Sequence, residues 1–357
     1  MNEERLNKNN KQVAIWLFAG VSMIVIQVLI GGITRLTESG LSITEWKPIT
    51  GALPPLNDAA WQSEFNKYRM TDQFRYVHQD FTLNDFKYIF FWEWMHRLWA
   101  RLLGIVFIIG FLYFLFTKKF NRKMIFPFVL LFLLGALQGV IGWLMVKSGL
   151  VPEKFFVGHI ELTTHLIAAL LLLGFTLWFA LSLYPGMQIP TRQKGWKFYL
   201  IFITVLVFCQ VILGGFMAGL KAAQTAPTWP DINGEIVPAM LNKLSPWYKN
   251  IINNQLTIHF FHRGVAYLIV ISTVLFYLKS LKMNSNILFK NFASSFFILI
   301  IIQVLLGILT VINATNKSSF IFLGVAHQFT AMLIIMNLVV LLYQVKGPNP
   351  HQYEGMS

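Results

Sequence analysis

The chain has 357 residues, of which 56% are hydrophobic and only 12% are charged, and its mean hydropathy is +0.59. A water-soluble protein of this size could not bury that much apolar surface, so the composition excludes a soluble globular domain and indicates an integral membrane protein. The net charge of +14 does not indicate nucleic-acid binding, because the basic residues cluster at alternate ends of the apolar segments.

Eight segments have the roughly 17 to 25 mainly apolar residues that a membrane-spanning helix needs. In chain order they are residues 13–33, 89–116, 124–146, 160–183, 196–220, 256–279, 287–312 and 320–343. Basic clusters precede the first segment and join the second to the third, the fourth to the fifth and the sixth to the seventh. The positive-inside rule therefore predicts that both termini are cytoplasmic, and we expect a multi-pass protein of the bacterial inner membrane.

The sequence also bears on processing of the N-terminus and on disulfide bonding. The N-terminal stretch is short, contains acidic residues and leads straight into a full-length span, so neither a cleaved signal nor a transit peptide is indicated. The single cysteine, Cys209, lies inside the fifth segment, so we expect no intramolecular disulfide.

A Gln-x-x-x-Gly motif recurs in every odd-numbered segment, starting at Gln27, Gln138, Gln210 and Gln303. Every even-numbered segment carries a histidine instead: His96, His165, His262 and His327. Corresponding residues of the two halves are separated by a nearly constant interval, except at the first glutamine, where the longer first outer loop makes it larger. The sequence therefore predicts an all-α polytopic membrane protein of eight transmembrane helices, built as a tandem repeat of two four-helix bundles, residues 1–187 and 188–357.

The motif itself has two interpretations. Small residues let helices approach closely and glutamine can hydrogen-bond across a helix interface, so packing is sufficient to explain it. The alternative is that the motif lines a cofactor pocket.

The four histidines are expected at a similar depth in the outer leaflet, where ionisable residues usually mark function. Two helices that each present an imidazole at one level are the arrangement needed for bis-histidine haem ligation, so we expect His96 with His165 and His262 with His327 to ligate two haem irons. A di-iron carboxylate site is an alternative, since Glu93-x-x-His96 resembles its motif and Glu161 precedes His165. It is disfavoured because the second half has no intramembrane glutamate.

The neighbours of these histidines differ between the halves. Glu93 lies one helical turn before His96, whereas His259 occupies the equivalent place before His262. This asymmetry predicts proton-coupled chemistry in one half and a resident cofactor in the other.

Three arginines are candidates for binding haem propionates, because guanidinium groups bind carboxylates in a bidentate manner: Arg97, Arg263 and Arg35. Snorkelling to the membrane interface is the alternative. The loops 35–88 and 221–255 are expected to cover the haem ends. Of the other histidines, His78 and His351 are predicted to be solvated and His159 to be interfacial.

Several motifs together resemble the haem A synthase family over nearly the whole chain. They are GGITRLTESGLSITEWKPITGALPPL at 31–56, then Glu93-Trp94-Met95-His96-Arg97, Thr228-Trp229-Pro230, Phe261-His262-Arg263 and Ala326-His327-Gln328. Other members carry a cysteine pair in the first outer loop. This chain has none there, so it resembles the subgroup of mitochondria and many Gram-negative bacteria.

The resemblance implies an oxidoreductase that converts the C8 methyl of haem O to a formyl group, giving haem A for cytochrome oxidase. It assigns His262 and His327 to a permanent haem b. It assigns His96 and His165 to the site of haem O, with Glu93 beside it as proton acceptor or electrostatic stabiliser.

The expected partners are haem O, haem O synthase, an electron acceptor and membrane lipid. Nucleic acid is not expected to bind, and the sequence permits an oligomer. A di-haem b-type cytochrome that carries electrons between quinol and a partner is the main alternative, and a haem transporter or chaperone is the third.

Overall fold

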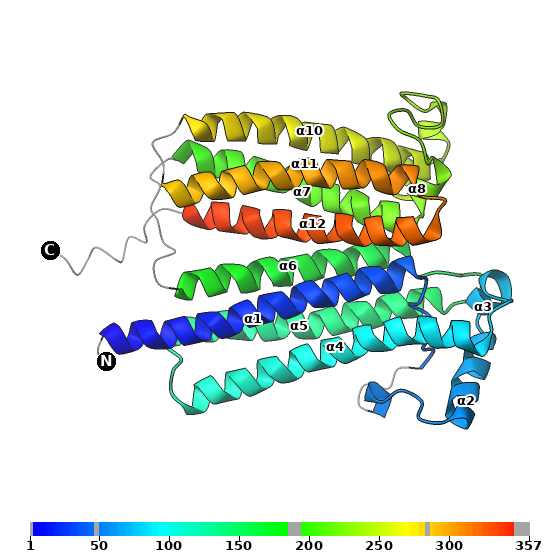
Figure 1. Cartoon of the computed structure of the whole chain (residues 1–357), viewed down its shortest axis with the longest axis horizontal. Helices are drawn as coiled ribbons and strands as arrows, with labels where there is room; N and C mark the ends of the chain where they lie inside the picture. Colours follow the sequence, from blue (N-terminus) through cyan, green and yellow to red (C-terminus); the bar gives the residue numbers. More distant parts are fainter. Residues whose placement is uncertain (1–2, 46–49, 185–193, 283–285, 346–357) are drawn as a thin grey trace.

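A computed structural model describes residues 3–45, 50–184, 194–282 and 286–345. Eight of its helices are long and apolar enough to cross a membrane (Figure 1). They are α1 (Glu3–Leu36), α4 (Leu83–Phe116), α5 (Arg122–Gly149), α6 (His159–Leu183), α7 (Lys194–Gly219), α10 (Gln255–Leu281), α11 (Ile287–Ile312) and α12 (Lys317–Gln344). Within the described residues the only β-structure is an isolated bridge between Ile232 and Glu235. The predicted all-α polytopic membrane protein is therefore confirmed.

Two of the spanning helices extend well beyond their apolar segments. The structure begins α1 at Glu3, so the polar N-terminal residues continue the helix. It begins α4 at Leu83, where Thr82 and Asp85 form a capping box that satisfies the first free backbone N–H groups. The expected start at residue 89 was too late for α4, because hydropathy reports transfer into lipid and not the length of a helix.

The spanning helices pack as two neighbouring groups (Figure 1). In the first, α1 packs against α4 and α6, and α5 packs against α6. In the second, α7 packs against α10 and α12, and α11 packs against α10 and α12. Contacts of α6 with α7 and α12, and of α1 with α12, join the groups. The predicted boundary at residues 187 and 188 lies outside the described residues.

The groups differ in one pair of helices. The helix α10 packs along α11, whereas the main chains of the corresponding helices α4 and α5 make almost no close contact. Aromatic side chains such as Phe111 and Phe128, with ring centroids 5.9 Å apart, still connect α4 to α5 near the ends that their short loop joins.

The long connections gather at one end of the molecule, called the loop end here (Figure 1). Between α1 and α4 they form η1 (Thr50–Ala52), α2 (Asp58–Arg69) and α3 (Asp72–Val77); between α7 and α10 they form α8 (Ala222–Thr225), η2 (Ala239–Asn242) and α9 (Tyr248–Asn253). A small aromatic core that includes Phe65, Tyr68 and Phe86 packs the first connection onto the start of α4. This core fixes the loop that contacts Glu93.

Candidate functional site

The four intramembrane histidines form the two pairs expected from the sequence. His96 on α4 and His165 on α6 are close enough to interact electrostatically, and so are His262 on α10 and His327 on α12. Each pair comes from two helices of the same group. This placement suits a group held between two imidazoles, and the ligand roles themselves remain predictions.

Each imidazole lies against the glycine of a Gln-x-x-x-Gly motif. A Cβ atom built on the glycine would lie 2.9 Å from His96 Cε1 at Gly31, and at Gly142 it would lie 2.9 Å from His165 Cε1. The corresponding distances in the second group are 3.4 Å from Gly214 to His262 and 3.0 Å from Gly307 to His327. In all four cases Cε1 is the nearest ring atom and Nδ1 the next. The four rings therefore present the same edge to the preceding helix.

Glu93 is buried at 3% exposure and is held by three donors. Its Oε2 accepts hydrogen bonds from Ser42 Oγ at 2.7 Å and from the Ile43 N–H at 2.8 Å. Its Oε1 accepts a hydrogen bond from Arg97 one turn further along α4. The carboxylate is therefore fixed between α4 and the first loop, as a positioned acid or base would be.

His259 occupies the same place in the second group and is fully buried. Its Nε2 accepts a hydrogen bond from Arg263 Nη2 at 3.0 Å. Each group thus has an arginine one turn after this position, paired with a carboxylate in the first group and with an imidazole in the second.

The three candidate arginines all donate to main-chain carbonyls near the loop end. Arg97 donates to Ile43 O at 3.1 Å and to Glu45 O at 3.3 Å. Arg263 donates to three carbonyl oxygens in the second connection, those of Thr228 at 2.6 Å, Asp231 at 2.7 Å and Pro230 at 3.2 Å. Arg35 donates to Ala218 O at the end of α7. Arg97 and Arg263 therefore anchor the two loops, and Arg35 connects the end of α1 to the end of α7. The sequence did not indicate these contacts because main-chain acceptors carry no residue signature.

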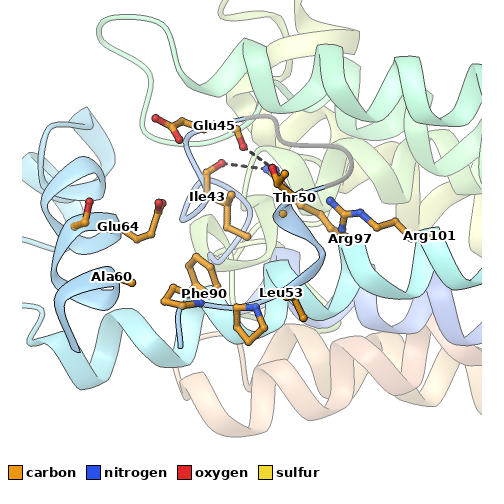
Figure 2. Close-up of a pocket in the computed structure, with 13 residues that line it drawn as sticks. Ile43, Glu45, Thr50, Leu53, Ala60, Glu64, Phe90, Arg97 and Arg101 are labelled. Atoms are coloured by element: carbon orange, nitrogen blue, oxygen red, sulfur yellow. Dashed lines mark hydrogen bonds between the residues drawn. The ribbon is translucent and has the colours of Figure 1, made fainter. Parts of the chain in front are cut away.

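A cavity of about 250 Å³ lies between the first loop, α2 and α4. Figure 2 shows Arg97 and Arg101 of α4 on one side of it and Glu64 of α2 on the other, with dashed lines from Arg97 to the loop carbonyls. Arg97 therefore borders a polar cavity, while the carboxylate of its partner Glu93 is buried beneath the first loop.

A second buried polar cluster joins the two groups at the loop end. Glu38, which follows α1, accepts hydrogen bonds from Lys221, which follows α7, and from His78. The prediction that His78 is solvated was wrong: it is 5% exposed, and its Nδ1 lies 2.6 Å from the Tyr68 hydroxyl. Burial alone would raise the pKa of the Glu38 carboxyl, but the hydrogen bonds and charges of His78 and Lys221 lower it to about 2.

A carboxylate-bridged metal centre finds no support in the described part of the chain. No group of three or more His, Cys, Asp or Glu side chains there could hold a metal ion. The di-iron alternative would need such a group, with glutamates from several helices.

These features define a multi-pass membrane protein whose intramembrane histidines lie close together in pairs and are half-buried. The family model described as cytochrome oxidase assembly protein, COX15-CtaA, matches residues 14–339. A protein from Bartonella tribocorum named heme A synthase is 38% identical over 95% of this chain and 94% of its own length. Proteins of the same name from Azorhizobium caulinodans and Flavobacterium psychrophilum are 39% and 37% identical, over 93% and 94% of this chain and 94% and 99% of their own lengths.

The chain belongs to this cytochrome oxidase assembly family. The resemblance expected from the motifs is thereby confirmed, and the single cysteine of the chain agrees with the subgroup that lacks the cysteine pair.

Proposed function

We propose that the protein is a haem A synthase, a membrane oxidoreductase that converts the C8 methyl of haem O to the formyl group of haem A. The observation that carries this function is the identity of 37% to 39% to heme A synthases over more than nine-tenths of the chain. The paired histidines supply what the reaction needs from the protein, two places where a haem can be held.

We assign His96 and His165 to the substrate, haem O, and His262 and His327 to a resident haem b. The support is the repeated geometry: in each group two imidazoles approach each other from two helices, and each turns the same edge to a glycine. Neutral imidazole pairs of this kind are axial haem ligands. A haem bound there supplies the redox-active iron.

Two differences between the groups support assigning the substrate to the first. A substrate and its product must enter and leave, whereas a resident cofactor is retained, and the sparse contact between α4 and α5 contrasts with the packed α10 and α11. Among the residues that the structure describes, only the first group has a buried carboxylate beside its histidines, at Glu93. Oxidation of a methyl group to a formyl group releases protons, so a fixed acceptor is needed on the substrate side.

Glu93 has the geometry for that role. Ser42 and Ile43 fix one carboxylate oxygen, and Arg97 neutralises the charge so that the group can remain buried. A carboxylate held in a dry site can accept a proton or stabilise positive charge at the methyl carbon. Arg97 and Arg263 hold the loops in place above the histidines, and together with Arg35 they are also positioned to meet propionates.

The membrane placement follows from the same reasoning. The chain is a multi-pass membrane protein. We propose that it lies in the inner membrane with both termini cytoplasmic and the loop end outside, and that haem O synthase and an electron acceptor are its partners. The basic clusters at the ends opposite the loop end support this orientation.

The function is tested by adding haem O and an oxidised electron acceptor to the purified protein in aerated buffer, because turning a methyl group into a formyl group removes four electrons, and by following the pyridine haemochrome spectrum and the extracted haems. We expect a formyl haem in the wild type. His262→Ala and His327→Ala should lose the low-spin haem b while the protein stays inserted. His96→Ala and His165→Ala should keep haem b and fail to convert haem O. Unchanged haem O in the wild type, with both haems bound, would instead identify a di-haem electron carrier.

A further inference from the structure

The Gln-x-x-x-Gly motifs contact the candidate ligands at more than the glycine. The amide Nε2 of Gln27 lies 3.1 Å from His96 Nδ1, and that of Gln138 donates to the main-chain oxygen of His165 at 3.0 Å. In the second group the amides of Gln210 and Gln303 lie 3.3 Å and 3.2 Å from the Nε2 atoms of His262 and His327. All four motifs thus meet the histidine of the following spanning helix.

The main chain of the glutamine also reaches the ring. His327 Nδ1 donates to Gln303 O at 3.1 Å, and the rings of His96 and His262 interact more weakly with the main chain of Gln27 and Gln210, since Nδ1 of His262 makes no hydrogen bond within the described residues. In an α-helix the carbonyl of residue i bonds to the N–H of residue i+4, which in these motifs is the glycine. Because glycine has no Cβ, an outside donor can reach the second lone pair of that carbonyl. The spacing of the motif is therefore the spacing that this contact requires.

These glycines differ from the glycines that follow them in the sequence. A Cβ on Gly32 would meet Gln328, and one on Gly215 would meet Thr163, so the second glycine of each Gly-Gly pair allows contact between the two groups of helices. At Gly31 the three nearest atoms all belong to His96, and at Gly214 the only described atoms within 4 Å belong to His262. Helix packing accounts for Gly32 and Gly215 and leaves the motif glycines unexplained.

We propose that each Gln-x-x-x-Gly motif is an imidazole seat: the glycine admits the histidine ring to the helix backbone, and the main-chain carbonyl of the glutamine four residues earlier accepts the Nδ1–H proton. Such a seat leaves the Nε2 lone pair for iron, fixes the plane of the ring and makes the imidazole more basic. The glutamine amide lies 3.2 to 3.3 Å from the Nε2 atoms of His96, His262 and His327, next to the atom that would bind iron. In the described residues the Oε1 of each of the four glutamines is buried and has no hydrogen-bond partner, and the same is true of Nδ1 of His165 and of His262.

This inference rests on the proposed haem ligation and adds the residues that position the ligands. The glutamines and glycines are then positioning residues, because they act through the histidines and do not themselves bind iron. It also explains why the motif repeats once for each histidine.

The test uses the haem b pair, because both of its seats can be altered without touching a ligand. Gly307→Ala places a methyl group 3.0 Å from His327 Cε1 and 3.5 Å from Nδ1, so the ring must move away from the Gln303 carbonyl. We expect the affinity for haem to fall about 10- to 100-fold, as for other outer-sphere partners of metal ligands. The haem that remains should have changed low-spin electron paramagnetic resonance g values. Its midpoint potential should be higher, because the imidazole is less basic.

Two matched variants calibrate the result. Gly214→Ala, at 3.4 Å from His262, should have a smaller effect on the same haem, and Gly264→Ala, with nothing within 4 Å of its Cβ, should have none. If Gly307→Ala does not accumulate, Gln303→Met keeps the main-chain carbonyl and removes the amide, and it should still change the g values. Loss of protein without a change in the spectrum or potential of the bound haem would show that the motif serves only helix packing, and it would refute the proposed imidazole seat.

The outcome is separable from that of the proposed function. Retention of low-spin haem in His327→Ala would refute the ligation itself. Loss of haem in His327→Ala, together with wild-type spectra and potentials in Gly307→Ala and Gln303→Met, would leave the ligation standing and refute only the seat.

Discussion

The Glu93–Arg97 pair allows the chemistry of the site to be separated from its structure. Glu93→Gln keeps one acceptor oxygen for Ser42 Oγ and the Ile43 N–H, but it turns an amide N–H towards Arg97. A hydrogen bond to a charged group contributes about 1.5 to 3 kcal/mol. Arg97 keeps two carbonyl acceptors and its side chain is 19% exposed, so we expect a loss of stability of about 2 kcal/mol, below the 3 to 5 kcal/mol typical of a broken buried pair.

The effect on turnover should be larger than that on stability. A positioned acid or base contributes about 10²- to 10⁴-fold, so Glu93→Gln should lower the conversion of haem O by a hundredfold or more while haem remains bound. Ser42→Ala is the matched control, since it removes one hydrogen bond from the same carboxylate and keeps the charge. It should cost about 1 kcal/mol and leave turnover within about tenfold of the wild type.

The double variant Glu93→Gln/Arg97→Gln decides between the two roles. Removing both charges leaves no unpaired buried ion, and the two amides can hydrogen-bond, but the donors to the Ile43 and Glu45 carbonyls are lost, so stability should recover only in part. Turnover should stay low because the carboxylate is still missing. Thermal denaturation in detergent, haem absorbance and chromatography of the product on one preparation give the three quantities. Recovery of turnover together with stability would show that Glu93 only braces Arg97 and the loop.

Two further predictions follow from the loop end. The pKa of Glu38 is lowered from 4.5 to about 2 in the folded protein, so its contribution to stability is complete above pH 4.5 and is lost as the pH falls towards 2. The thermal midpoint should therefore drop more steeply over this range in the wild type than in Glu38→Gln or Lys221→Met, and parallel curves would contradict the argument. Reporter fusions at Asn121 should read cytoplasmic and those at Lys67 and Asn233 external; a reversal at two of the three would invert the proposed orientation.

The spanning helices and the pairing of the histidines could be predicted because both are local, periodic properties. Eight apolar segments of this length are stable only as membrane-spanning helices, and a histidine in every second segment must recur on alternate helices. The start of α4 could not be predicted in the same way. Residues from Leu83 onward project beyond the apolar segment, and they are helical because Thr82 caps them and Phe86 packs under the first loop.

The contacts of the arginines and of His78 depend on residues far apart in the chain. Arg97 and Arg263 could be recognised as functional, but their acceptors are main-chain carbonyls. His78 lies in a polar stretch, and only the folded loop places it between Tyr68 and Glu38. The same reasoning applies to the Gln-x-x-x-Gly motif: its recurrence was visible in the sequence, and the histidine it holds was not, because that histidine belongs to the next spanning helix.

The contrast between Glu93 and His259 makes a final prediction about the direction of electron flow. Both side chains are buried, and each contacts an arginine one turn later in its helix. In the first group the Glu93 carboxylate compensates the charge of Arg97, whereas in the second group Arg263 lies beside an imidazole. Positive charge near a haem stabilises its reduced form, which favours electrons moving from the first group to the second. His259→Glu would place a carboxylate next to Arg263 and should lower the midpoint potential of the haem b that we assign to His262 and His327. His259→Gln, which adds no charge, is the control and should shift the potential less. Equal potentials in the wild type and both variants would mean that this position does not set the direction of transfer.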